Sequence, residues 1–261
     1  MINKKLLVLF LIFTVSLMLT YPAAAHFQLI LPSDDTIDRT ESAELSLQLI
    51  FTHPMAAGPT MEMKKPVRFG VVNRGKTTDL LSTLKAAKFK GKQIWQASYQ
   101  TKAPGDYVFY LEPAPYFESS EDKYITQFTK IVVNKMGMPT DWDSELGLPA
   151  EIIPLTRPYG LWTGNSFRGI VKRNGKVVPD AEIEIEYLNT ASFSDLNDNS
   201  LNLPAPVFEN QVVKTDQNGV FVYTIPRAGW WGFSALLTGD KVKNKDHEVG
   251  AIIWVKAYNF D

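Results

Sequence analysis

The sequence predicts an all-β protein of two consecutive β-sandwich domains, of the immunoglobulin-like or transthyretin-like kind, after a cleaved signal peptide. Beyond the N-terminal segment, β-branched and aromatic residues alternate with polar ones, and helical periodicity is scarce. Gly, Pro and Asn separate the alternating runs. A period of two is what antiparallel strands with one solvated face require, so this pattern is typical of sandwiches.

Residues 1–25 have the order of a secretory signal peptide. Lys4 and Lys5 precede an apolar run over residues 6–19, and three alanines close the segment at Ala25. The run is shorter than the roughly 20 residues of a membrane-spanning helix. We therefore expect cleavage after Ala25, a mature chain that begins at His26, and a periplasmic or extracellular location.

Composition limits the possible partners. The chain contains no cysteine, which excludes disulfides and thiolate metal sites. Its formal net charge is −1, and removal of the two signal-peptide lysines makes it more negative. Without a basic cluster, nucleic acid and anionic membranes are poor partners.

The clearest strands lie in the second half. Residues 182–187 alternate charged and apolar side chains, and Asn174 and Gly175 supply a turn that tolerates positive φ. Residues 220–225 and 230–237 flank a Pro- and Gly-containing turn, so we expect them to form a hairpin.

A short aromatic pattern occurs in both halves at a constant offset of 124 residues. Each copy has one aromatic residue before a glycine and two after it, which suggests two related sandwiches. Chance sharing between strand–turn–strand units is the alternative. The matched pairs are Tyr99 and Tyr223, Gly105 and Gly229, Tyr107 and Trp231, and Phe109 and Phe233.

Glycines and prolines interrupt residues 136–156, so we place the domain boundary near Pro154. This gives an N-terminal sandwich over residues 26–154 and a C-terminal sandwich over residues 155–261. Residues 77–88 carry leucines and an alanine at helical spacing, which predicts one short helix.

His26 is the most informative candidate for chemistry. A lone histidine in a β protein is usually a surface or hydrogen-bonded residue, but signal cleavage would leave His26 with a free α-amine. The pKa of such an amine is about 7.7 to 8, so a metal can displace its proton near neutral pH. Amine nitrogen and imidazole can then chelate together, and they suit nickel, cobalt, copper and zinc.

His53 is the leading second ligand. It lies in the segment 51–63, which Pro and Gly mark as a loop. Thioethers there are soft metal donors, although methionines also fill gaps beneath loops, and Glu62 offers a harder oxygen. The methionines of this segment are Met55, Met61 and Met63.

The remaining polar candidates are weaker. Glu118 stands in an acidic cluster that reads as a solvated loop and offers at best a secondary metal ligand, and His247 lies in a charged turn. Paired carboxylates can hydrolyse glycosides, but nothing in the sequence places these in a cleft. Motifs for serine hydrolases, zinc proteases and phosphate loops are absent, so we predict no enzyme and no catalytic residue.

Six segments carry a family resemblance: HFQLILPS at 26–33, FTHPM at 51–55, MEMKKP at 61–66, PAPYFE at 113–118, AEIIPLTRP at 150–158 and GWWGF at 229–233. With them the chain resembles the bacterial periplasmic components associated with nickel and cobalt uptake transporters, a domain of formerly unassigned function. The resemblance implies an accessory protein that binds Ni²⁺ or Co²⁺ and presents it to a membrane energy-coupling-factor type transporter.

Two details qualify the resemblance. The second half also resembles carboxypeptidase-regulatory sandwiches through residues 169–181, but those modules are scaffolds and a fold alone does not grant function. At Gln127, the family often has a histidine. If that histidine is a ligand elsewhere, the affinity or metal preference of this chain is expected to differ.

Three functions therefore stand. The leading one is nickel or cobalt binding, with His26 and His53 as core ligands and Met55, Met61 and Met63 as further candidates. A copper-binding protein, or a copper monooxygenase built on an N-terminal histidine, is the second, and oxidative cleavage products would distinguish the enzyme. A metal-free scaffold or adhesion module is the third, favoured if the two histidines lie far apart.

Overall fold

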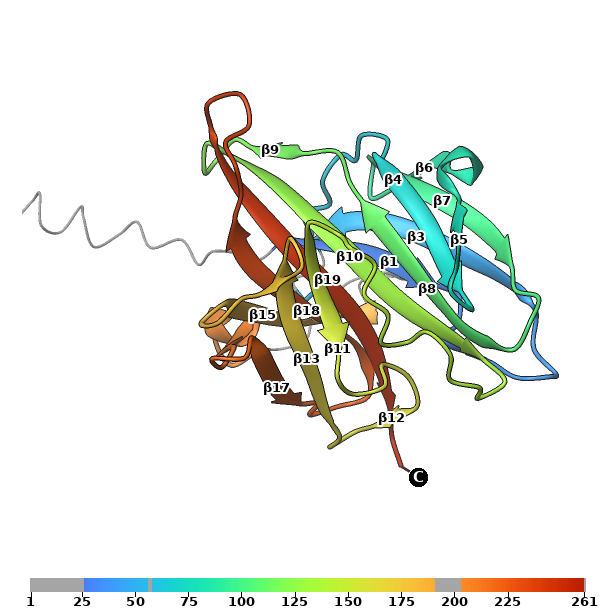
Figure 1. Cartoon of the computed structure of the whole chain (residues 1–261). Helices are drawn as coiled ribbons and strands as arrows, with labels where there is room; N and C mark the ends of the chain where they lie inside the picture. The colour runs from blue at the N-terminus through green and yellow to red at the C-terminus, as the bar shows by residue number, and fades with distance from the viewer. Residues whose placement is uncertain (1–25, 56–57, 191–202, 261) are drawn as a thin grey trace, which may run out of the picture.

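The computed structural model describes residues 26–55, 58–190 and 203–260, and nearly all of its regular structure is β-strand (Figure 1). This confirms the all-β prediction. Helical structure in these ranges is limited to 3₁₀ turns such as η1 Leu81–Thr83 and η3 Pro206–Phe208. Across the same ranges, no helix has the length and apolar character to cross a membrane.

The first half is a sandwich of two mainly antiparallel layers. One layer has the order β1-β3-β7-β6, and the other runs β10-β8-β4-β5. This is the ABED and GFC arrangement of an immunoglobulin-like sandwich. Short strands β2 Thr36–Ile37 and β9 Tyr116–Glu118 pair with β10. The main strands are β1 Phe27–Pro32, β3 Glu44–Thr52, β4 Arg68–Asn73, β5 Lys76–Asp79, β6 Lys85–Phe89, β7 Lys92–Gln100, β8 Gly105–Glu112 and β10 Lys123–Lys135.

Within the described residues, the second half also has two layers of four main strands each. One layer contains β11, β13, β14 and β17, and the other runs β16-β15-β18-β19. Short β12 Leu161–Trp162 pairs with the end of β19. The strands are β11 Ala150–Pro154, β13 Ser166–Arg173, β14 Lys176–Val177, β15 Glu182–Tyr187, β16 Gln211–Lys214, β17 Val220–Thr224, β18 Gly229–Thr238 and β19 Asp246–Tyr258.

The two halves join through parallel pairing of β10 with β19, which lie side by side across the centre of the molecule (Figure 1). Their register runs from Lys123 opposite Asp246 to Ile131 opposite Trp254. The shared sheet has its two faces covered by different halves, because Trp254 belongs to the first core while its neighbour Ile253 belongs to the second. The division at Pro154 stays a prediction, although β11, which ends there, pairs with β13 of the second half.

The repeated aromatic pattern has the same geometry in both halves. Gly105 and Gly229 have φ of 135° and 122°, a region that favours glycine. In each copy the aromatic ring before the glycine lies 5.4 to 5.9 Å from both rings after it. Tyr107 and Trp231 each donate a side-chain hydrogen bond to the carbonyl four residues upstream. The same corner therefore stabilises both sandwiches.

Two sequence predictions are wrong. Strands β17 and β18 do not form a hairpin, because β17 pairs with β13 in one layer and β18 pairs with β15 and β19 in the other. The helix predicted over residues 77–88 is replaced by β5, the turn η1 and β6. Leu80 and Leu84 are buried on either side of that turn, so the leucine spacing reflects core packing.

Candidate metal centre

His26 and His53 meet because β1 and β3 are antiparallel neighbours. The register pairs Phe27 with Thr52, so the residues just outside this pair, His26 and His53, stand opposite each other. Their ring centroids lie 4.4 Å apart at an interplanar angle of 52°. His53 is buried at 5% exposure, and the His26 side chain is 13% exposed. Strand pairing thus brings together the two leading candidates.

Glu118 approaches His26 from β9. The Nε2 atom of His26 lies 3.1 Å from Oε2 of Glu118, whose other oxygen accepts from the amide and hydroxyl of Ser120. When the neutral His26 ring donates from Nε2, its Nδ1 is the acceptor that faces the backbone side of the residue. This is the nitrogen that can chelate together with an α-amine.

Burial and charge act in opposite directions on this pair. Burial lowers the pKa of His26, and the nearby carboxylate of Glu118 opposes that shift. Burial would raise the pKa of Glu118, but hydrogen bonds from Ser120 and the His26 charge hold it below its usual range. Near neutral pH the site therefore combines an uncharged His26 ring with a carboxylate anion.

Gln127 fixes the backbone at the start of β1. Its amide nitrogen donates to the His26 carbonyl at 2.5 Å, and its amide oxygen accepts from the Gln28 N–H at 2.8 Å. A Cβ at Gly250, opposite on β19, would lie 2.7 Å from Cγ of Gln127. Because both ends of this amide bind backbone, Gln127 holds His26 in place in this chain.

The three methionines are buried in the cores. Met55 lies in the second core cluster, and Met61 and Met63 lie in the first. The sulfur of Met63 accepts a hydrogen bond from Gln28 at 3.8 Å. These buried positions favour the alternative that the methionines fill gaps in the core. Metal ligation by the methionines stays a prediction.

The other polar candidates have their own partners. His247 contacts the Thr126 hydroxyl through Nε2 at 2.9 Å and the Asp240 carbonyl through Nδ1 at 3.1 Å. Glu62 accepts from the N–H of Gln93. Within the described ranges, no group of three or more His, Cys, Asp or Glu side chains could hold a metal ion. A complete site here needs donors besides the two imidazoles.

Glu186 supports the loop that carries His53, and the sequence pattern does not predict this role. The alternation of residues 182–187 predicted a solvated glutamate face, yet Glu186 is 3% exposed because the loop after His53 covers it. Its carboxyl accepts from the Met55 N–H at 3.2 Å, and Asn189 donates its N–H to the Pro54 carbonyl. Burial raises the pKa of Glu186 well above its usual range. The second half thus supports the loop that carries His53.

Fold and site together define a tandem β-sandwich protein with a histidine pair at the junction of its halves. The sequence matches the family described as domain of unknown function DUF4198 over residues 23–239, so the chain belongs to this family. No curated protein matches the sequence.

Several solved structures are similar at low identity. A bacterial ice-binding adhesin is 8% identical, with 90% of this chain and 65% of that chain covered and a TM-score of 0.25. The Yersinia pseudotuberculosis adhesin InvE is 10% identical, with 89% and 61% covered and a TM-score of 0.26. The titin fragment I67–I69 is 7% identical, with 90% and 66% covered and a TM-score of 0.22. The chain spans about two thirds of the length of these structures, and such low scores carry no argument about function.

Proposed function

We propose that the processed protein is a non-enzymatic, extracytoplasmic nickel- or cobalt-binding protein that presents the metal to a membrane uptake transporter. The observation that carries the proposal is the 4.4 Å separation between the ring centroids of His26 and His53. Signal cleavage before His26 would add a free α-amine to this pair. The resemblance of six segments to nickel and cobalt uptake components supports the transport role.

The donor chemistry supports a borderline-soft divalent metal. The α-amine and Nδ1 of His26 would bind as a chelate, and a ring nitrogen of His53 would add a third donor. Glu118 would orient the His26 ring and hold its Nε2 proton, as outer carboxylates do for metal-binding histidines. Because burial lowers the pKa of the His26 ring, metal binding near neutral pH would release little proton from the imidazole, and the α-amine would be the main group that loses one.

Charge around the site favours capture of a cation. Glu121 and Glu248 act on His26 electrostatically in addition to Glu118, and Lys123, which pairs with both, offsets part of their charge. Such a cluster of carboxylates raises the local concentration of divalent cations. Partial exposure of His26 leaves one side open, which suits a carrier that must release its cargo.

Calorimetric titration of Ni²⁺, Co²⁺ and Cu²⁺ into protein that begins at His26 tests the binding. We expect nickel or cobalt to bind at one site per chain. Binding of copper alone, with oxidative cleavage of a polysaccharide in the presence of reductant, would instead support the copper alternative.

Radiolabelled nickel accumulation tests the transport role. Cells that carry the uptake transporter should accumulate nickel with the wild-type protein and less with the His53→Ala variant. Equal accumulation with and without the protein would contradict a role in uptake.

A further inference from the structure

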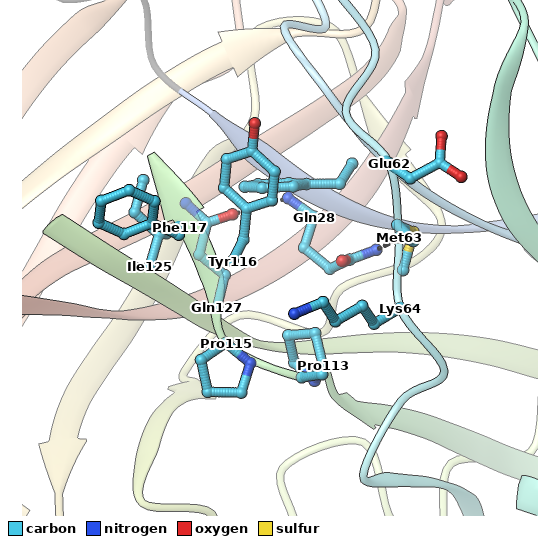
Figure 2. Close-up of a pocket in the computed structure, with 12 residues that line it drawn as sticks. Gln28, Glu62, Met63, Lys64, Pro113, Pro115, Tyr116, Phe117, Ile125 and Gln127 are labelled. Atoms are coloured by element: carbon cyan, nitrogen blue, oxygen red, sulfur yellow. Dashed lines mark hydrogen bonds between the residues drawn. The ribbon is translucent and has the colours of Figure 1, made fainter. Parts of the chain in front are cut away.

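Figure 2 shows a cavity of about 240 Å³ whose lining includes residues that contact His26. Phe51 and Tyr116 line it, and their rings also lie 5.6 and 6.4 Å from the His26 ring. Gln127, which binds the His26 carbonyl, lines it as well. The cavity and the candidate metal centre therefore share a wall.

The lining is unsuited to a hydrated metal ion. Most of it is apolar, with contributions from Met63, Pro113, Pro115 and Ile125. Apolar walls offer no replacement for the water that a free ion would lose on entry. They suit the body of a small organic molecule.

Lys64 gives the cavity a positive group. Its side chain extends across the cavity toward Gln127 in Figure 2, and no salt bridge involves it among the described residues. The other charged lining residue, Glu62, has its carboxylate on the side away from Tyr116, where it accepts the N–H of Gln93. An ammonium at this position favours an anionic group and opposes a bare cation.

We propose that this cavity binds the organic part of a metal complex, so that the cargo is a metal chelate with a small, partly apolar carboxylate. The chelating end would face His26 and His53, the apolar body would fill the cavity, and a second carboxylate would pair with Lys64. This inference rests on the proposed function and names its cargo. It also supplies donors that the described side chains do not provide.

The test uses three pyridine carboxylates with Ni²⁺ and protein that begins at His26. Pyridine-2,5-dicarboxylate chelates nickel through its nitrogen and one carboxylate and keeps the other free. Pyridine-2-carboxylate chelates but lacks the second carboxylate, and pyridine-3,5-dicarboxylate has two carboxylates but cannot chelate through the ring nitrogen. We expect calorimetry to show that the 1:1 nickel complex of the 2,5-isomer binds about tenfold more tightly than Ni²⁺ alone.

Two variants test whether the added affinity for the 2,5-isomer complex comes from Lys64. Lys64→Met should reduce the affinity for the 2,5-isomer complex to that of the pyridine-2-carboxylate complex, while the neighbouring Lys65→Met should not. The inference is overturned if free Ni²⁺ and the 2,5-isomer complex bind equally, if the gain survives in Lys64→Met, or if the 3,5-isomer gives the same gain.

The proposed function and this inference fail in different ways. If Ni²⁺ alone binds at the histidines and no complex binds more tightly, only the chelate inference fails. If neither free nickel nor any complex binds, the proposed metal-binding function fails and the inference fails with it.

Discussion

Two polar clusters lie at the junction of the sandwiches, and they differ in how far their charged or titratable side chains are exposed. Lys130 and Glu151 form a buried ion pair at 2.7 Å, with side chains 2% and 1% exposed. Glu151 also accepts three backbone N–H groups, from Leu146, Gly147 and Leu148. Burial lowers the pKa of Lys130, and Glu151 opposes this shift. Such a saturated pair has no capacity left for a ligand.

The histidine cluster is more open to solvent at His26. The ring centroids of His26 and His53 lie 4.4 Å apart, and the His26 side chain is partly exposed. Two adjacent imidazoles cannot both carry a proton without repulsion, whereas a metal ion would join them. The comparison teaches that the Lys130 cluster joins the two halves, and it leaves the more exposed His26 cluster as the place where we propose that metal binds.

Breaking the buried ion pair should have the largest effect. Glu151→Gln leaves Lys130 buried without its counter-charge, so we expect a loss of about 3–5 kcal/mol in the free energy of unfolding, measured by urea denaturation. Glu145→Gln, which removes an exposed partner of Lys172, should change it by less than about 1 kcal/mol. A comparable loss in both variants would contradict the structural role of the buried pair.

Removing His53 should affect binding instead. His53→Ala should lower nickel affinity by more than about a hundredfold, because loss of even an outer-sphere partner costs about 10- to 100-fold. Calorimetry measures the affinity, and His247→Ala is the matched control because that ring bonds to Thr126 and Asp240. Equal losses in the two variants would mean that His53 has no special role.

Glu118 should have an intermediate effect on the same affinity. Glu118→Gln keeps the shape but weakens the hold on Nε2 of His26, so we expect a loss of about tenfold in nickel affinity. Glu182→Gln serves as the control, because its exposed carboxylate pairs with Lys214 and does not act on His26. If Glu118→Gln binds like the wild type, Glu118 does not orient the ring.

The smallest expected change in stability comes from Glu184, a partly buried carboxyl group in the second half. Burial raises the pKa of Glu184 to about 7 from its usual 4.5. The native state therefore binds more protons than the unfolded state between these values, so stability falls as pH rises from 4.5 to 7. Glu184→Gln should be about 1 kcal/mol more stable than the wild type at pH 8, allowing for solvent screening, and no more stable at pH 4.

Thermal unfolding at the two pH values measures this difference. An equal gain at pH 4 and pH 8 would show that the charge of Glu184 is not its cause.

Local patterns predicted the strands and the leading ligand pair. The alternation over residues 182–187 became β15, and the turn at Asn174 and Gly175 has the positive φ that such a turn uses. Residue chemistry alone points to His26 and His53 as candidates, and the pairing of β1 with β3 brings their rings together.

Non-local pairing could not be predicted from the same patterns. The parallel contact of β10 with β19 joins residues more than a hundred positions apart, and it decides which face of each strand is covered. Likewise, no local pattern places the loop after His53 over Glu186, or the amide of Gln127 against the backbone of His26.

The most direct test of the central claim compares nickel binding by two proteins, one that begins at His26 and one with Gly-Ser placed before it. The extension converts the α-amine of His26 into an amide and leaves both imidazoles intact. The account predicts tight binding by the first protein and its loss in the second. Equal affinity in both proteins would contradict the amine-and-imidazole site.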